Sequence, residues 1–499
     1  MIEPTILPER SPARQLMHGT TWQIAVRWTI RLTGVVSTVL LARLLTPADY
    51  GIVAIATLIL GSIEVLSEVG LYNAVIRHPN PTREHYDSAW TLSLLLGLGL
   101  SLIVLAATPL TSIYFHEPRA KPVLMVLALR TALGGFQNVA VLNFQRNFQF
   151  HKQFQWYVGS TMIAFVAVIT SAFVLRNYWA LVIGIMSKQV STIALSYIIE
   201  PYWPRLSWAK VPELFSFSFW TLIRNIGTYA NNQVDKLAIG GFGGATAMGR
   251  YDVGRDVASS PITEAVSPMV FVLFPVMARL QDDREKRRDL FLGALSWSAL
   301  ICTSTAIGVA LVASDMTDLV LGPKWDSVKP LMPWFALSYG VVGLTSSVYS
   351  ALDALGYAYR SAQLQWARVI GLTLVVFPVA FYYRDIEAVA IACFLFSVTI
   401  SPMLFYALST TLHLSMRDIA LTLWRPFSAG AAMTIAVLSV NSWIEFVGAP
   451  RLVLDILLGA TTFAASLMVI WSVVGRPNGP EWVLWTQMRK WRSRFVSRP

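Results

Sequence analysis

Apolar segments recur about every 30 residues between Thr20 and Val474, and charged side chains stand inside several of them. A run of about 20 apolar residues is long enough to cross a bilayer as an α-helix. The pattern predicts about fourteen such helices, and therefore an all-α polytopic membrane protein. The predicted segments are residues 19–43, 50–73, 88–112, 122–143, 156–175, 178–199, 214–240, 251–277, 291–313, 330–355, 363–382, 387–409, 424–445 and 452–474.

Composition agrees with this pattern. Hydrophobic residues make up 55% of the 499 residues and charged residues 13%, whereas a soluble protein carries about a quarter charged residues. Such a chain cannot solvate its surface in water, so its main solvent is lipid. The polar, proline-rich stretch from Met1 to Pro12 does not fit a cleavable signal peptide.

The sequence gives no support for metal, cofactor or enzyme chemistry. Cys302 and Cys393 lie in apolar segments and are predicted to be packed thiols, and the six histidines form no ligand set. We therefore expect no metal and no cofactor. No nucleotide-binding motif is present, which removes direct ATP hydrolysis as an energy source. A membrane enzyme for lipid-linked sugars needs a large loop, and every loop here is short.

The net charge of +11 is concentrated in alternate loops. By the positive-inside rule these loops are cytoplasmic, and both termini are predicted to face the cytoplasm. The basic tail at 475–499 carries Trp482, Trp485 and Trp491, a combination typical of a segment that binds membrane lipids on an anionic leaflet. Nucleic-acid binding is the weaker alternative and is not expected.

The chain divides at a proline-containing cytoplasmic link, residues 200–213. We expect a cytoplasmic N-terminus at 1–18, a first lobe of six helices at 19–199, a second lobe of six at 214–409, and two further helices at 424–474.

The two predicted lobes begin alike. Trp22 is followed by Arg27 in the first, as Trp220 is followed by Arg224 in the second. Such similarity is typical of transporters built from two repeats around a central site, although chance likeness among apolar helices is the alternative.

Charged pairs inside the first two segments are the main candidates for function. Arg27 and Arg31 are four residues apart, so they share one helix face near mid-bilayer, and Glu64 and Glu68 repeat the spacing on the second segment. One interpretation is a structural ion pair that joins helices one and two. The other is that the arginines bind an anionic substrate while a glutamate tunes or neutralises them. Lys188, in the middle of its segment, is a further cavity candidate.

The seventh and eighth segments carry a second set of charges. Arg224, Asn231 and Asp235 fall on one helix face, and Arg255 and Glu264 follow in the next segment. We take Arg224 and Arg255 as candidate substrate ligands, and Asp235 and Glu264 as candidates for coupling or ion pairing.

Glycines and prolines punctuate the same region. The run from Gly240 to Gly244 predicts a flexible outer turn. Pro261, Pro268 and Pro275 recur every seven residues, which predicts either a bent or broken helix or a static kink. Arg368, near a cytoplasmic end, is expected to extend its side chain to the membrane surface.

Several motifs resemble those of a known family. The run from Leu41 to Gly51 (LARLLTPADYG), followed by Glu68-Val69-Gly70-Leu71, resembles the front end of Wzx-type polysaccharide flippases. These belong to the multidrug/oligosaccharidyl-lipid/polysaccharide exporter superfamily, and the colanic-acid-exporter-like branch is the most similar. Later matches are Asn231–Lys236, Gly249–Tyr251, Phe274–Leu280 and Leu321–Trp325.

The resemblance implies two pseudo-symmetric six-helix lobes plus two C-terminal helices in the bacterial inner membrane. It implies alternating access, with a cationic cavity that moves a polyprenyl-pyrophosphate-linked oligosaccharide to the outer leaflet. It further implies work alongside the polymerase and export machinery of the same pathway. Two alternatives stay open: a cation-coupled small-molecule exporter of the same superfamily, which would favour carboxylates in its cavity, and a membrane-embedded polysaccharide polymerase or ligase.

Overall fold

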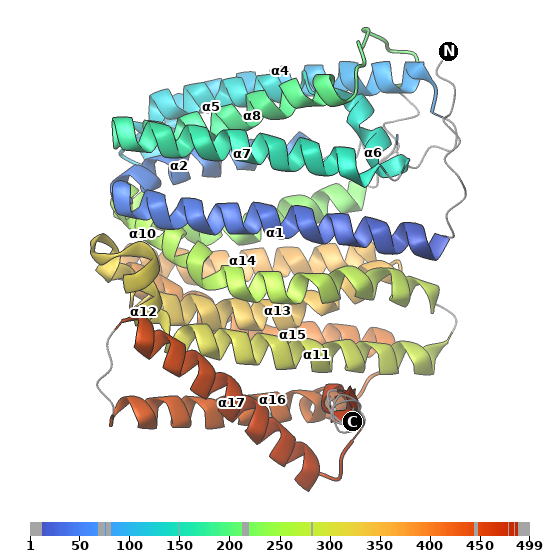
Figure 1. Ribbon diagram of the computed structural model, residues 1–499, viewed down its shortest axis with the longest axis vertical. Coiled ribbons are helices and arrows are strands. Elements are labelled where there is room, and N and C mark those ends of the chain that lie inside the picture. The colour runs from blue at the N-terminus through green and yellow to red at the C-terminus, as the bar shows by residue number, and fades with distance from the viewer. Residues whose placement is uncertain are drawn as a thin grey trace, which may run out of the picture. The chain divides into compact units, whose positions relative to one another are not determined.

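The computed structural model describes residues 12–67, 75, 81–147, 149–211, 219–280, 283–443, 448–477, 479–483 and 485–487. These residues form helices joined by short connections, and no β-strand occurs among them (Figure 1). Within this part of the chain, twelve helices are long and apolar enough to span a membrane. The prediction of an all-α multi-pass membrane protein is therefore confirmed.

The chain forms two compact units, and the first, unit 1, comprises Met1–Asn225. In unit 1, α4 packs along α5 and α7 packs along α8, while α1 lies against α7 and α5 lies against both α2 and α8 (Figure 1). Its elements are α1 (Pro12–Leu44), α2 (Pro47–Glu64), η1 (Val65–Ser67), α4 (Arg83–Tyr114), α5 (Ala120–Gly134), η2 (Val139–Val141), α6 (Leu142–Arg146), α7 (Phe150–Leu175) and α8 (Trp179–Ile199).

The second unit, unit 2, comprises Ile226–Pro499. In unit 2, α11 packs on α13 and on α16, α13 and α14 pack on α15, and α16 packs on α17. Its elements are most of α10 (Phe219–Arg279), then α11 (Arg284–Leu311), α12 (Ala313–Met316), η3 (Thr317–Leu321), η4 (Pro323–Val328), α13 (Met332–Ala354), α14 (Ala358–Tyr383), α15 (Ile386–Leu412), α16 (Met416–Asn441) and α17 (Ala449–Val473).

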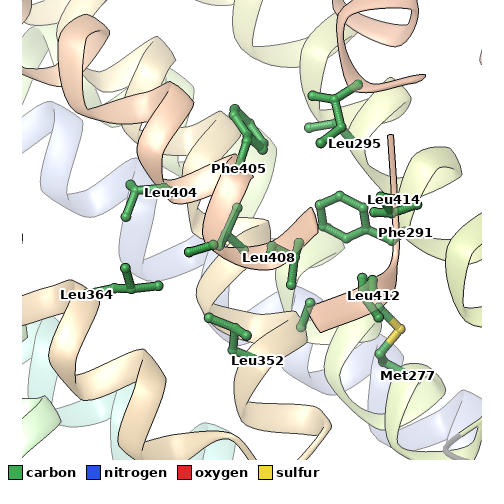
Figure 2. Close-up of a cluster of buried hydrophobic side chains, with 14 of the residues drawn as sticks. Met277, Phe291, Leu295, Leu352, Leu364, Leu404, Phe405, Leu408, Leu412 and Leu414 are labelled. Carbon is green, nitrogen blue, oxygen red and sulfur yellow. The ribbon is translucent and has the colours of Figure 1, made fainter. Parts of the chain in front are cut away.

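An apolar cluster joins six helices of unit 2, with Ile419 contributed by α16. Figure 2 shows Met277 of α10, Phe291 of α11, Leu352 of α13, Leu364 of α14 and Leu408 of α15 converging on one core. Burial between membrane helices brings little hydrophobic gain, because the lipid that these side chains leave is itself apolar. Close packing carries much of the stabilisation instead.

The two units repeat the same order of helix neighbours. The pairs α4–α5, α7–α8 and α5–α8 of unit 1 correspond in chain order to α11–α13, α14–α15 and α13–α15 of unit 2. The caps repeat as well: α7 ends at Arg176 and α14 at Arg384, both in the left-handed conformation with φ 50° and 49°. This internal correspondence supports a duplicated architecture. The lobe boundaries predicted from the sequence stay predictions.

The glycine run forms a tighter turn than the sequence suggests. The helix continues through Gly240 to Gly243, and the non-helical backbone inside α10 is at Gly244, with φ 68° and ψ −171°. α10 therefore consists of two helical arms, residues 219–243 and 245–279. With these two arms and the short α5, the architecture is compatible with the fourteen segments predicted.

The prolines do not break the second arm of α10. The backbone stays helical through Pro261 and Pro268, so the helix is not broken there, and a bend or a static kink stays a prediction. A proline removes one hydrogen bond, and the neighbouring helices hold the segment in place.

The described part of the C-terminal tail folds back on unit 2. The ring of Trp471 on α17 lies 6.2 Å from those of both Trp482 and Trp485, and Glu481 forms a buried ion pair with Arg425 of α16 at 2.9 Å. Trp491 lies outside the described residues. The predicted binding of the tail to an anionic leaflet stays a prediction.

Gly244→Ala should destabilise the protein by about 1–3 kcal/mol, because its φ/ψ region is open only to glycine. A Cβ at Gly244 would meet no atom within 4 Å, so the cost is backbone strain alone. Gly293→Ala is the matched control, since its Cβ also meets open space and its φ is ordinary. Thermal unfolding in detergent checks this prediction, and equal midpoints for the two variants would contradict it.

Candidate functional site

The two arginines of α1 lie on an accessible face. Arg27 is exposed and Arg31 is half-buried, and their spacing of four puts them on one side of the helix. Trp22, about one turn earlier, packs edge-on against Phe154 of α7, with ring centroids 5.1 Å apart. Unit 1 therefore carries two cations that are not enclosed in its core.

Glu64 is held by α5. Nη1 of Arg130 donates to both carboxylate oxygens of Glu64, at 2.9 and 3.0 Å, and the Thr131 hydroxyl donates to one of them at 2.9 Å. The side chains of Arg130 and Glu64 are 30% and 29% exposed. The structural pair predicted for Glu64 joined helices one and two, whereas these contacts join α2 to α5. Glu68 lies outside the described residues.

Lys188 points from α8 to α7, where its ammonium donates to the hydroxyl of Thr161. It is half-buried. The adjacent Gln189 lies beside Gly134 of α5, which is one turn from Arg130. Lys188 and Arg130 therefore lie at similar positions along the helices of unit 1, Lys188 with a hydroxyl partner and Arg130 with a carboxylate partner, and both are partly accessible.

Unit 2 holds a buried ion pair between the two arms of α10. Nη1 of Arg255 donates to both oxygens of Asp235 at 2.9 Å, and Tyr251 donates its hydroxyl proton to the same carboxylate at 2.8 Å. Nε of Arg255 donates to the Tyr339 hydroxyl at 2.7 Å, and Nη2 donates to the carbonyl of Asn232 at 2.8 Å. The two charged side chains are each 10% exposed.

A second ion pair joins the same two arms of α10, with the acid and the base exchanged between the arms. Lys236 of the first arm contacts Asp252 of the second, so each arm contributes one acid and one base. Most of the donors of Arg255 are thus occupied inside the protein. Geometry favours a role for Arg255 within unit 2, and its role as a substrate ligand stays a prediction.

The other residues that the sequence analysis singled out differ in burial: two charged residues are half-buried, whereas one arginine and the two cysteines are buried. Arg224 and Glu264 are half-buried, and Arg224 donates to the side chain of Asn225 at 3.2 Å. Arg368 is 5% exposed and lies near Tyr349 of α13 and Cys393 of α15. Its expected extension to the membrane surface is therefore wrong, because the neighbouring helices enclose it. Cys302 and Cys393 are free and buried, as the sequence predicts.

The hydroxyl partners of these charges cannot be predicted from the sequence pattern. Thr131, Thr161 and Tyr339 stand in apolar segments, and threonine hydroxyls in such segments commonly bond to their own helix backbone. Arg130 is an isolated charge within its apolar segment. Its pairing with Glu64 becomes evident when α2 and α5 are placed side by side.

Comparisons with known proteins agree with this architecture. The chain is 25% identical to the lipopolysaccharide biosynthesis protein WzxC of Escherichia coli (strain K12), over 82% of this chain and 84% of that protein. It is 24% identical to the succinoglycan biosynthesis transport protein ExoT of Rhizobium meliloti (strain 1021), over 72% and 74%. Its fold is similar to that of the lipid II flippase MurJ in an inward closed conformation. That match has a TM-score of 0.71 and 11% identity, and it covers 91% of this chain and 99% of the other.

The family model described as "Polysaccharide biosynthesis protein" matches residues 40–330, which is more than half of the chain. This range runs from the end of α1 to the connection before α13 and includes the Glu64–Arg130 and Asp235–Arg255 pairs. It confirms the resemblance that the motifs indicate: this multi-pass membrane protein belongs to the polysaccharide biosynthesis protein family.

Proposed function

We propose that this protein is a flippase that moves a polyprenyl-pyrophosphate-linked oligosaccharide from the cytoplasmic to the periplasmic leaflet of the bacterial inner membrane. The product would feed polysaccharide assembly outside the cytoplasm, next to the polymerase and export machinery. The names of the relatives WzxC and ExoT, which refer to polysaccharide biosynthesis and transport, support this assignment. The charge pattern of the loops supports cytoplasmic termini.

The observation that carries the proposal is the accessibility of Arg27 and Arg31 on a membrane helix. A charge exposed to hydrocarbon is costly, so such residues almost always face a water-filled cavity or a polar partner. A pyrophosphate carries about two negative charges and matches the bidentate geometry of guanidinium. The same site would not attract a cationic drug, which argues against the exporter alternative.

The other unit 1 charges complete an adjustable cationic site. Lys188 adds a point charge, while Glu64 shares Arg130 and can neutralise it when substrate is absent. Arg224 and Glu264 are further candidates for substrate contact and coupling. Each retains partial exposure, which a ligand or an ion needs for access.

We assign Arg255 and Asp235 to internal support instead. Their charges satisfy one another, two tyrosine hydroxyls and a backbone carbonyl in a buried setting. Removing one member of such a pair leaves an uncompensated charge and typically costs about 3–5 kcal/mol. The pair holds the two arms of α10 together and keeps this hairpin rigid.

An apolar cavity in unit 2 is a candidate site for the lipid tail. A cavity of about 510 Å³ lies between α11, α13, α15 and α16. Side chains such as Leu337, Val341, Phe405 and Phe427 line it. A sugar headgroup needs a polar path, because each unsatisfied polar group costs several kcal/mol in hydrocarbon, whereas the prenyl chain needs only apolar contact.

Arg31→Ala should reduce polysaccharide export about tenfold or more, because a charge-assisted hydrogen bond contributes about 1.5–3 kcal/mol. Export by Arg31→Lys should be higher than export by Arg31→Ala and lower than export by the native protein, because lysine keeps the charge and loses the bidentate geometry. Export by a strain that lacks its own flippase measures this, with membrane levels checked by immunoblot. Arg43→Ala, in the last turn of the same helix, is the control and should export normally. Normal export by Arg31→Ala would refute the cationic site.

Arg255→Ala and Asp235→Ala should each lower the unfolding temperature in detergent, because each leaves a buried charge without its partner. The double variant Asp235→Ala/Arg255→Ala should recover most of that loss. A direct role in substrate binding predicts a different result: Arg255→Ala would then unfold at the native temperature and lose export, and the double variant would not recover it.

A further inference from the structure

The link after α8 is a well-packed segment with a polar inner face. Residues 201–210, which we call the strap, run along the first turns of α4. Asp87, Ser88 and Thr91 of α4 share one helix face and are all buried beneath it. The strap is therefore a fixed part of unit 1.

Asp87 anchors the first half of the strap. Its carboxylate accepts the Tyr202 hydroxyl at 2.6 Å and the backbone N–H of Arg205 at 3.0 Å. Burial, followed by the bond to this carboxylate, raises the pKa of the Tyr202 phenol well above its ordinary value, so Tyr202 stays a donor at any physiological pH. Arg83 contacts both Asp87, at 3.7 Å, and the Tyr202 ring.

Ser88 and Thr91 anchor the second half. The N–H of Ser207 donates to the Thr91 hydroxyl at 2.9 Å, and the N–H of Lys210 donates to the Ser88 hydroxyl at 3.2 Å. Val211 then packs into an apolar cluster with Ala89 and Val139. These bonds use up polar groups of the strap backbone and fix the direction of its outer side chains.

The outer face of the strap carries exposed apolar and aromatic side chains, with basic side chains beside them. Trp203, Leu206 and Trp208 are 79%, 71% and 63% exposed. Arg83 and Arg205 are exposed beside them, and Lys210 is half-buried. Two nearby acids are already engaged: Asp87 within the strap, and Glu200 with Lys152 at 2.9 Å.

The strap lies where two membrane helices end. α8 ends at Ile199, two residues before the strap, and α4 begins at Arg83. Tryptophan is enriched at membrane–water interfaces, where its ring is buried and its N–H reaches water or headgroups. Lysine and arginine near the surface of an anionic membrane each contribute attraction. In water, by contrast, three large exposed apolar side chains on one short segment would be unfavourable.

We propose that the outer face of the strap lies in the headgroup region of the surrounding bilayer and binds anionic lipid there, with Trp203 and Trp208 inserted and Arg83, Arg205 and Lys210 contacting the headgroups. This is a lipid-binding surface separate from the substrate site, and it does not depend on which molecule the protein transports. The strap thereby holds the ends of α4 and α8 at a constant depth.

Single-cysteine labelling tests this proposal, because both native cysteines are buried. An environment-sensitive fluorophore is attached through Trp203→Cys or Trp208→Cys in the full-length protein, reconstituted in vesicles with or without phosphatidylglycerol. Lys286→Cys is the control for a water-exposed site, since that side chain is 71% exposed in a charged stretch. The native protein, treated with the same fluorophore, measures background labelling of Cys302 and Cys393.

At the two strap positions we expect strong quenching by lipids spin-labelled near the headgroup, and iodide quenching several-fold weaker than at the control. Phosphatidylglycerol should increase the protection, and Arg205→Gln/Lys210→Gln should remove that increase. Asp87→Asn should raise iodide access at both positions while the protein stays in the membrane, because it loosens the anchor.

Three results would overturn the proposal. Iodide access at the strap equal to that at Lys286→Cys would mean that the face lies in water. Protection in native membranes but not in pure-lipid vesicles would mean that a protein covers it. Equal protection with and without phosphatidylglycerol would refute anionic-lipid binding.

Discussion

The cost of placing charge in hydrocarbon organises both units of this protein, and the two units meet it differently. Unit 2 encloses one charged pair: the guanidinium of Arg255 and the carboxylate of Asp235 are each 10% exposed and bond to one another, with further bonds to Tyr251 and Tyr339. Unit 1 keeps its charges accessible, as in the Glu64–Arg130 pair at about 30% exposure and in the exposed Arg27. Because a cation must be accessible to bind a ligand, we propose that unit 1 carries the anion-binding site.

The two units differ in the exposure of these charged side chains, although their helices are arranged in a similar way. Both units have the same order of helix neighbours. The helices α7 and α14, at corresponding positions, are each followed by an arginine whose backbone is in the left-handed conformation. The duplicated helices provide similar packing, whereas the polar side chains on them differ. We propose that the buried Asp235–Arg255 pair gives the α10 hairpin of unit 2 its rigidity. The turn at Gly244 agrees with a rigid hairpin, because a single residue joins the two arms of α10. Two ion pairs, Asp235–Arg255 and Lys236–Asp252, then hold the arms together.

The sequence predicted the helices well because hydrophobic length alone decides which segments can span lipid. It also located the charges, including Arg27, Arg31, Lys188 and Asp235. Their partners could not be predicted in the same way. Glu64 and Arg130 are 66 residues apart, and their pairing depends on how α2 packs against α5. The burial of the Arg368 side chain likewise depends on α13 and α15, which enclose it, whereas the sequence predicts that it extends to the membrane surface. A helix face is encoded locally, whereas the neighbour it meets is a property of the tertiary fold.

The strap extends the same physical rule to the membrane surface. Its inner face satisfies backbone N–H groups and Tyr202 with side chains of α4, so the segment can stay extended without a β-sheet. Its outer face then presents indole rings and basic groups together, a combination suited to the boundary between lipid and water. A flippase must move a polar group through a fixed thickness of hydrocarbon, so the depth of its binding cations matters. Because α1 packs on α7, α7 on α8, and α8 ends at the strap, the depth of Arg27 and Arg31 is tied through packed helices to the interface that the strap occupies.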